Sequence, residues 1–424
     1  MNHEKLLTIN KKDLINLNIF WLGFIIYSIC FTLSSSNNAN YKVIQSGQIL
    51  GLIFIFYTIV NLIQYKFDNQ YLKIVFSLYC AWLFTVILRG FILDYSFLKD
   101  FLFNPDVGML YFSPLILLFP RNLIFLKRVF DVIIIFGIFY LIFDVLFVKD
   151  LLSSDRSNMT GQGMVEFFSI LSFPSGFLIL TYAYHSKPKQ ILAIFVLFFA
   201  ILFAIVRARR GLILMYSSLF LFSYVVFIVT AKRKILALYL TSLLLLLGIF
   251  YFSKIYKFNE SPIFGYISDR GSEDTRTGIE LYFYNDMKTK DWILGRGING
   301  EYFCPNVEEN QVTNYRNGIE TGYLQTILKG GIISLGLFLL IAIPAIIRGL
   351  FNSKNLLSKA AAIWILMSIL NSYPAVINSF SLNYLIVWIS IGICYSKEIR
   401  MLSDNNLKEQ LQSQKIFKNS ILKQ

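Results

Sequence analysis

The chain has 424 residues, of which 56% are hydrophobic, and its mean hydropathy of +0.60 excludes a soluble globular domain. The formal net charge is +14. Because the positive charge lies mostly in the connections between apolar segments and in a basic C-terminal tail, it fits anchoring beside anionic lipid and gives no reason to expect a nucleic-acid partner.

Apolar runs long enough to cross a hydrocarbon core of ~30 Å as helices recur along the chain. They predict an all-α, polytopic membrane protein with about twelve spans. In chain order the spans are 14–34, 44–64, 71–93, 106–120, 129–148, 166–184, 190–206, 211–230, 235–252, 323–347, 358–378 and 380–396. The fourth is short and contains Pro114, which favours a broken or re-entrant segment, and the last two divide near Pro374.

The distribution of Lys and Arg predicts the orientation. With both termini in the cytoplasm, the inner connections carry many more basic residues than the outer ones. The chain then divides into nine spans over residues 1–252, a large external loop over 253–320, three spans over 321–396 and a cytoplasmic basic tail over 397–424. No cleavable signal peptide is expected.

Three arginines in the sequence RARRG break this orientation bias at the outer end of the seventh span. They are Arg207, Arg209 and Arg210. One interpretation is that they reach lipid phosphates along the membrane surface. The other is a binding site for a phosphate or diphosphate, since the planar guanidinium donates two hydrogen bonds at once and stays charged.

The external loop supplies two further candidate site residues. Arg276 stands among acidic residues, so it is either a surface ion-pair partner or a second diphosphate ligand. Glu320 precedes the tenth span and is either an acidic residue favoured by the helix dipole or a general base for a sugar hydroxyl. Tyr323 and Trp292 are candidate aromatic contacts for sugar rings. Residues 276–287 predict an amphipathic helix, and GRG at 295–297 predicts a turn.

Metal chemistry is not favoured in this loop. It contains no DxD, HExxH or paired-cysteine spacing, and both histidines, His3 and His185, lie elsewhere. We therefore expect neither a metal nor another cofactor. Cys304 is the only cysteine of the loop, so no disulfide is implied there.

Three stretches together resemble the O-antigen polymerase and O-antigen ligase superfamily of bacterial surface-polysaccharide assembly. VRARRGLIL at 206–214 resembles the family's arginine-glycine motif at an outer span end. TRTGIELYFYNDMKTKDWILGRGIN at 275–299 resembles the entry to its large outer loop, and IETGYLQTILKGGIISLGLFLL at 319–340 resembles the loop exit. The resemblance covers about residues 200–345.

The resemblance implies a metal-independent glycosyltransferase of the GT-C kind in the bacterial inner membrane. Its donor would be an undecaprenyl-diphosphate-linked oligosaccharide, held by Arg210 (with Arg207 or Arg209) and Arg276, while Glu320 would activate the acceptor. Other expected partners are membrane lipid, a chain-length regulator and a flippase. Ligases of the family characteristically have histidine at the loop exit, where this chain has Glu320, and this favours a polymerase of repeat units.

Two alternatives remain open. One is the ligase, which moves finished glycan to another acceptor. The other is a flippase or transporter of lipid-linked oligosaccharides, which should show matched halves, charges deep inside spans and short loops. A single large outer loop and interfacial arginines favour an enzyme.

Overall fold

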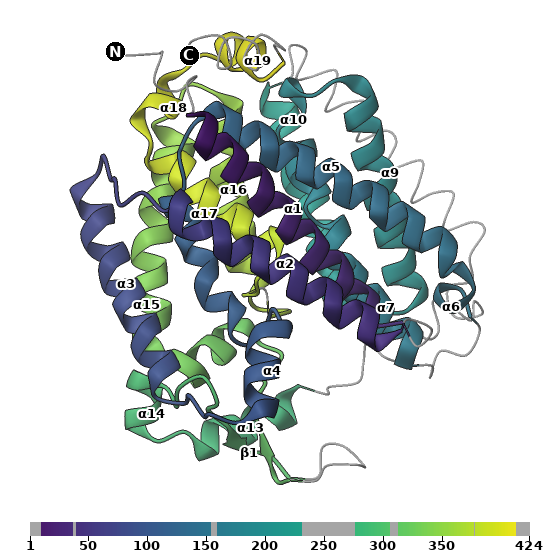
Figure 1. Cartoon of the computed structure of the whole chain (residues 1–424), viewed down its shortest axis with the longest axis vertical. Helices are drawn as coiled ribbons and strands as arrows, with labels where there is room; N and C mark the ends of the chain where they lie inside the picture. The colour runs from purple at the N-terminus through teal and green to yellow at the C-terminus, as the bar shows by residue number, and fades with distance from the viewer. Residues whose placement is uncertain are drawn as a thin grey trace.

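The computed structural model describes residues 10–36, 40–153, 159–230, 276–305, 313–376 and 378–412. The ninth predicted span, 235–252, and residues 253–275 and 306–312 of the polar loop lie outside the described residues. Within them the chain is mostly helical (Figure 1), which confirms the all-α class.

Eight helical segments of the described chain are long and apolar enough to cross a membrane. Seven of these are single helices: Lys11–Leu33 (α1), Tyr41–Leu62 (α2), Gln70–Leu88 (α3), Leu123–Leu146 (α5), Lys187–Val206 (α9), Arg210–Thr230 (α10) and Gly322–Phe351 (α15). The eighth, Gly163–Leu180, joins Met159–Ser172 (α7) to Ser175–Leu180 (α8). Shorter apolar helices are Met109–Leu118 (η2), Leu356–Asn371 (α16) and Leu382–Tyr395 (α17).

Asparagine is the N-cap residue of many of these helices. Its short side chain accepts a hydrogen bond from one of the first backbone N–H groups, which have no partner within the helix. The residues that act in this way are Asn10 before α1, Asn40 before α2, Asn69 before α3, Asn122 before α5 and Asn355 before α16. These caps explain why the helices begin a few residues before the purely apolar runs.

Three of the predicted spans are interrupted. The fourth is a ten-residue 3₁₀ helix, η2, which contains Pro114 and follows a turn at 104–108. The sixth breaks at Pro174, between α7 and α8. The eleventh ends at Asn371, and the chain passes Pro374 before α17 begins at Leu382. Non-helical backbone at membrane depth is tolerated where it is buried in protein or lines a cavity. We therefore expect these three breaks to be buried or to border a cavity.

The helix α17 forms the centre of the molecule. It is apolar on all sides, and nearly every residue from Leu382 to Tyr395 is buried. Trp388 on this helix is fully buried and packs against Phe76, Tyr79 and Phe338. Because lipid tails are as apolar as these side chains, the packing stabilises the helices mainly through van der Waals contacts. α17 is thus the rigid element against which the other helices pack.

The described part of the polar loop lies at one end of the helical bundle. It contains the helices Thr277–Asp286 (α13) and Thr289–Leu294 (α14), and the paired strands Tyr302–Phe303 (β1) and Tyr315–Arg316 (β2). α13 corresponds to the helix predicted at 276–287. Tyr95–Phe103 (α4) lies near this end, whereas Lys397–Met401 (α18) and Asp404–Gln412 (α19) lie at the opposite end (Figure 1). The short segments Val148–Leu151 (α6) and Tyr182–Tyr184 (η3) join longer helices.

The polar loop is attached to α15 by a kink at Gly331. This residue has φ +69° inside the helix, so the carbonyl groups before it are released from helical bonding. The backbone N–H groups of Arg296 and Gly297 donate to Leu328 O (2.7 Å) and Lys329 O (2.9 Å), and Trp82 Nε1 donates to Gly330 O (2.9 Å). The GRG turn predicted at 295–297 therefore connects the loop to α15, and Arg89 at the end of α3 joins it through Nη1, which donates to Gly295 O at 3.2 Å.

Arg296 ties the loop together internally. Its guanidinium pairs with Asp286 (2.5 Å) and Asp291 (2.8 Å) and donates to the carbonyl of Glu301 (2.6 Å). Partial burial tends to raise the pKa of Asp286, but hydrogen bonds from Arg296 and from the Phe303 N–H outweigh it, so the pKa is lowered. The loop is a folded unit in its described part.

The first half of the predicted cytoplasmic tail is also folded. Residues 404–412 form α19, in which Leu407 and Leu411 are buried. Asp404 accepts a hydrogen bond from Tyr184 and one from the Leu356 N–H (2.8 Å). This segment caps the end of the bundle opposite the polar loop.

Candidate functional site

A cavity of about 550 Å³ lies between the interrupted spans. Its walls come from the turn after α4, from α7, from the start of α10, from α16 and from the connection that leads to α17. This volume lies within the ~300–1,000 Å³ range of small-molecule sites. Its charged lining residues are Asp106, Glu166, Arg209, Arg210, Arg276 and Glu320.

The RARRG sequence forms a tight turn between two helices. α9 ends at Val206, Ala208 adopts φ +49°, and α10 begins at Arg210. A positive φ at alanine is sterically unfavourable and reverses the chain within very few residues. The turn therefore brings Arg209 and Arg210 to the cavity wall at the first turn of α10.

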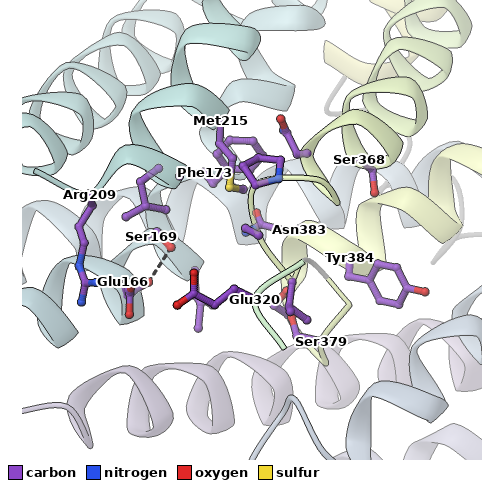
Figure 2. Close-up of a pocket in the computed structure, with 18 of the residues that line it drawn as sticks. Glu166, Ser169, Phe173, Arg209, Met215, Glu320, Ser368, Ser379, Asn383 and Tyr384 are labelled. Carbon is purple, nitrogen blue, oxygen red and sulfur yellow. Dashed lines mark hydrogen bonds and ion pairs between the residues drawn. The ribbon is translucent and has the colours of Figure 1, made fainter. Parts of the chain in front are cut away.

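Arg209 forms an ion pair with Glu166 across the cavity wall. The distance between Arg209 Nη1 and Glu166 Oε1 is 3.0 Å, and the side chain of Glu166 is 51% exposed. Glu166 lies on α7, next to Ser169, whose hydroxyl donates to the Glu166 carbonyl (Figure 2). An ion pair this accessible contributes little to stability, so a more strongly bound anion can displace the carboxylate.

Arg276 connects the polar loop to the same cavity. Its Nε lies 3.0 Å from Glu320 Oε2, and its Nη2 donates to Pro374 O at 2.9 Å. Pro374 belongs to the non-helical connection between α16 and α17. The side chain of Glu320 is 63% exposed. The loop entry, the loop exit and the broken span therefore meet at one point.

Four of the seven site residues predicted from the sequence line this single cavity: Arg209, Arg210, Arg276 and Glu320. The predicted alternative for Arg276, an ion pair with an acidic neighbour, is also observed, because its partner is Glu320. The two interpretations are compatible, since the pair itself lies at the cavity.

Arg207 lies apart from the cavity and is only 1% exposed. Its Nε donates to Leu151 O at 3.0 Å, and its Nη2 donates to Asp150 O. These carbonyls end the short helix α6, where positive charge is favourable. The side chain therefore joins α9 to α6.

Tyr323 and Trp292 also lie outside the lining of the cavity. The Tyr323 hydroxyl donates to the carbonyl of Ile369. Trp292 stacks on Tyr284 with ring centroids 5.9 Å apart, and it packs edge-on against Phe283. Trp292 thus belongs to an aromatic group on the folded loop.

The remaining polar lining of the cavity was not predicted from the sequence. Figure 2 shows Ser379, Asn383 and Tyr384 on the side of the cavity away from Arg209 and Glu166, with Glu320 between them. Ser379 Oγ donates to Ser381 Oγ at 2.6 Å. The usable signal was the break near Pro374, because polar residues beside a broken span tend to face a cavity.

Glu166 was not predicted as a site residue either, and the remaining charged lining residue that was missed is Asp106. It lies in the turn between α4 and η2, within the segment predicted as a broken span. Asp106 lines the cavity, and the part of its surface that solvent can reach faces that cavity. The protein atoms around it desolvate the carboxyl group and raise its pKa to about 6.

The described residues contain no group of three or more His, Cys, Asp or Glu side chains placed to hold a metal ion. The charged lining consists of three arginines and three carboxylates. Such a cavity can bind an anionic group through the arginines while carboxylates remain to accept protons or hydrogen bonds.

Comparison with known proteins provides no relative. No protein-family model matches the chain, and neither a curated protein nor a solved structure matches it.

Proposed function

We propose that this protein is a membrane glycosyltransferase that polymerises lipid-linked oligosaccharide repeat units of a bacterial surface polysaccharide. The observation that carries the proposal is the single cavity shared by Arg209, Arg210, Arg276 and Glu320. The donor would be a glycan on undecaprenyl diphosphate and the acceptor a terminal sugar of a new lipid-linked unit. The resemblance over residues 200–345 supports this substrate class.

The arginines suit a diphosphate leaving group. Breaking the bond between the sugar and the diphosphate concentrates negative charge on phosphate oxygens, and positioned guanidinium groups stabilise this charge. In the proposal, Arg209 and Arg210 bind the diphosphate from α10, and Arg276 binds it from the loop. Arg207 has no part in it, because its guanidinium is committed to backbone carbonyls.

The proposal also includes the membrane location and the topology of the protein. We place the protein in the bacterial inner membrane with about twelve spans in a GT-C-like arrangement, both termini in the cytoplasm and the polar loop outside. α13 and α14 lie at the opposite end from α18 and α19, as this topology requires (Figure 1). The Trp292–Tyr284 stack then offers a surface for sugar rings outside the membrane. A chain-length regulator and a flippase would act beside the protein.

Deletion of the gene followed by gel analysis of the surface glycan tests the proposal. We expect the ladder of polymer lengths to disappear while single repeat units still reach the surface. Loss of all capped glycan with polymer accumulating on the carrier lipid would identify a ligase instead. Accumulation of unpolymerised lipid-linked units on the cytoplasmic side would identify a flippase.

A further inference from the structure

We infer that Asp106 is the catalytic base that deprotonates the acceptor sugar in this cavity. The inference rests on the proposed function and assigns a role that the resemblance had attached to Glu320. It follows from the partners of the three carboxylates that line the cavity and from the chemistry of the wall around Asp106.

Two of the three carboxylates already hold an arginine. Glu166 pairs with Arg209 and Glu320 pairs with Arg276, each at 3.0 Å. A guanidinium that is bound to a carboxylate occupies oxygen atoms that would otherwise accept the proton of the acceptor hydroxyl. Across the described ranges of the chain, no ion pair includes Asp106. Among the described residues, Asp106 is therefore the lining carboxylate that is not paired with an arginine.

The wall that Asp106 shares differs from the arginine wall. Its residues are neutral and polar, with Ser379 and Ser381 beside Asn383 and Tyr384, and Trp364 also lines the cavity. Asn383 Oδ1 is a buried acceptor without a hydrogen-bond partner in the part of the chain that the structure describes. Neutral hydrogen-bonding groups beside an aromatic ring suit sugar hydroxyls, whereas the arginines suit phosphate.

The turn that interrupts the fourth predicted span positions Asp106 at the cavity. Pro105 O accepts a hydrogen bond from the Phe380 N–H at 2.8 Å, so the turn that carries Asp106 is fastened to the connection before α17. Within the same turn, Asn104 Oδ1 accepts from the Asp106 N–H at 3.0 Å. Two independent contacts therefore hold this residue at the cavity.

The proposed step balances without a co-reactant. The acceptor hydroxyl gives its proton to the Asp106 carboxylate, and its oxygen forms a bond to the anomeric carbon of the donor. The bond between that carbon and the phosphate oxygen breaks, and its electron pair leaves with undecaprenyl diphosphate. Enclosure raises the pKa of Asp106 to about 6, which leaves it ionised at neutral pH but basic enough to accept the proton.

The test uses the full-length protein in lipid nanodiscs with lipid-linked repeat units as substrate. Asp106→Asn keeps the shape and removes the base, and we expect transfer to fall about 10²–10⁴-fold. Binding of undecaprenyl diphosphate, measured by native mass spectrometry, should stay unchanged. Asp100→Asn, an exposed aspartate on neighbouring α4, is the matched control and should retain full transfer.

The pH profile separates a catalytic from a structural role. Transfer by the natural protein should decline below about pH 6, and the residual transfer of Asp106→Asn should lack this decline. The other ionisable groups near Asp106 are Tyr27, Tyr384 and the remaining carboxylates and arginines of the cavity. Glu320→Gln should therefore keep the decline, although its rate is lower.

Three outcomes would overturn the inference. In the first, Asp106→Asn transfers as fast as the natural protein. In the second, Asp106→Asn loses lipid binding and thermal stability together with transfer. In the third, Glu320→Gln rather than Asp106→Asn abolishes the decline at low pH. Absence of any transfer by the natural protein would instead reject the proposed polymerase and the inference with it.

Discussion

At the scale of single residues, the neighbouring arginines of one motif have different roles. Arg209 and Arg210 line the cavity, whereas Arg207 is buried and bound to carbonyls of α6. The turn at Ala208 separates them, because it sends side chains two residues apart in different directions. Sequence spacing alone cannot distinguish an arginine that lines a cavity from one that is buried against backbone carbonyls.

Substitution of Arg210 by alanine should abolish most polymer formation. Removing one charged donor from a site of this kind lowers the rate about 10²–10³-fold. Glu320→Gln should also reduce polymer, since Arg276 loses its 3.0 Å ion-pair partner. Complementation of the deleted strain, with immunoblotting of membranes as the control for protein level, measures both. Normal ladders from both variants would show that the cavity is not the site.

Substitution of Arg207 by alanine should act through stability. It leaves two buried carbonyl groups without their donor, at a cost of about 1–3 kcal/mol. We expect a lower Tm in detergent and a reduced amount of protein in membranes. Arg209→Ala is the matched control, because its ion pair is accessible and should contribute less than about 1 kcal/mol. Equal Tm values for the two variants would contradict this distinction.

At the scale of elements, the described part of the polar loop is folded and is attached to the helices at defined points. Arg296 organises its interior, the kink at Gly331 receives its GRG turn, and Arg276 connects it to the cavity. The hydrogen bonds to Leu328 O and Lys329 O can form only because α15 is interrupted there. The positive φ of Gly331 and the close approach of the Ile293 carbonyl explain why residue 331 is glycine.

Substitution of Gly331 by alanine should detach the loop. A Cβ at this position would lie 2.0 Å from Ile293 O, and its φ of +69° is unfavourable for alanine by about 1–3 kcal/mol. Hydrogen exchange of the backbone amides at 295–298 should become faster, and polymer formation should fall. Gly336→Ala on the same helix meets no atom within 4 Å and should change neither quantity.

Low pH should reduce the stability of the polar loop. The pKa of Asp286 is lowered in the folded protein, so its pairing with Arg296 stabilises the loop at pH values above the ordinary pKa of about 4. This stabilisation is lost as the pH falls from there through the lowered pKa. Hydrogen exchange of the loop amides, corrected for intrinsic rates, should therefore be faster at pH 3 than at pH 6. In Asp286→Asn the amides should be less protected already at pH 6.

At the scale of the whole molecule, the breaks in the predicted spans coincide with the cavity. Asp106, Phe173 and Pro374 lie at or beside three interruptions, and all of them line it. Broken helices leave short connections with free backbone groups, which need polar partners within the membrane. The polar loop closes one end of this arrangement, and α18 and α19 occupy the other (Figure 1).

Chemical labelling of single cysteines should establish the orientation. In a chain without its four natural cysteines, Lys288→Cys on the loop should react with an impermeant maleimide in spheroplasts. Lys66→Cys, exposed on the connection between α2 and α3, should react only after the membrane is opened. The reverse pattern would invert the proposed topology.

Much of this organisation follows directly from the amino-acid sequence. Apolar runs of ~20 residues must form helices in a membrane, so the all-α class and most helix positions are determined locally. The arginines of the RARRG turn, Arg276 and Glu320 could also be identified as candidate site residues. A charged residue near the end of a membrane span is energetically unfavourable, so it indicates a functional site.

Only the tertiary structure decided which of these residues share a cavity. Arg276 and Glu320 are 44 residues apart, and the turn that carries Asp106 meets Phe380 through a backbone hydrogen bond. Such contacts depend on how broken helices pack against α17, and no local pattern encodes that packing. The separation of Arg207 from Arg209 and Arg210, and the place of Asp106 at the cavity, follow from it.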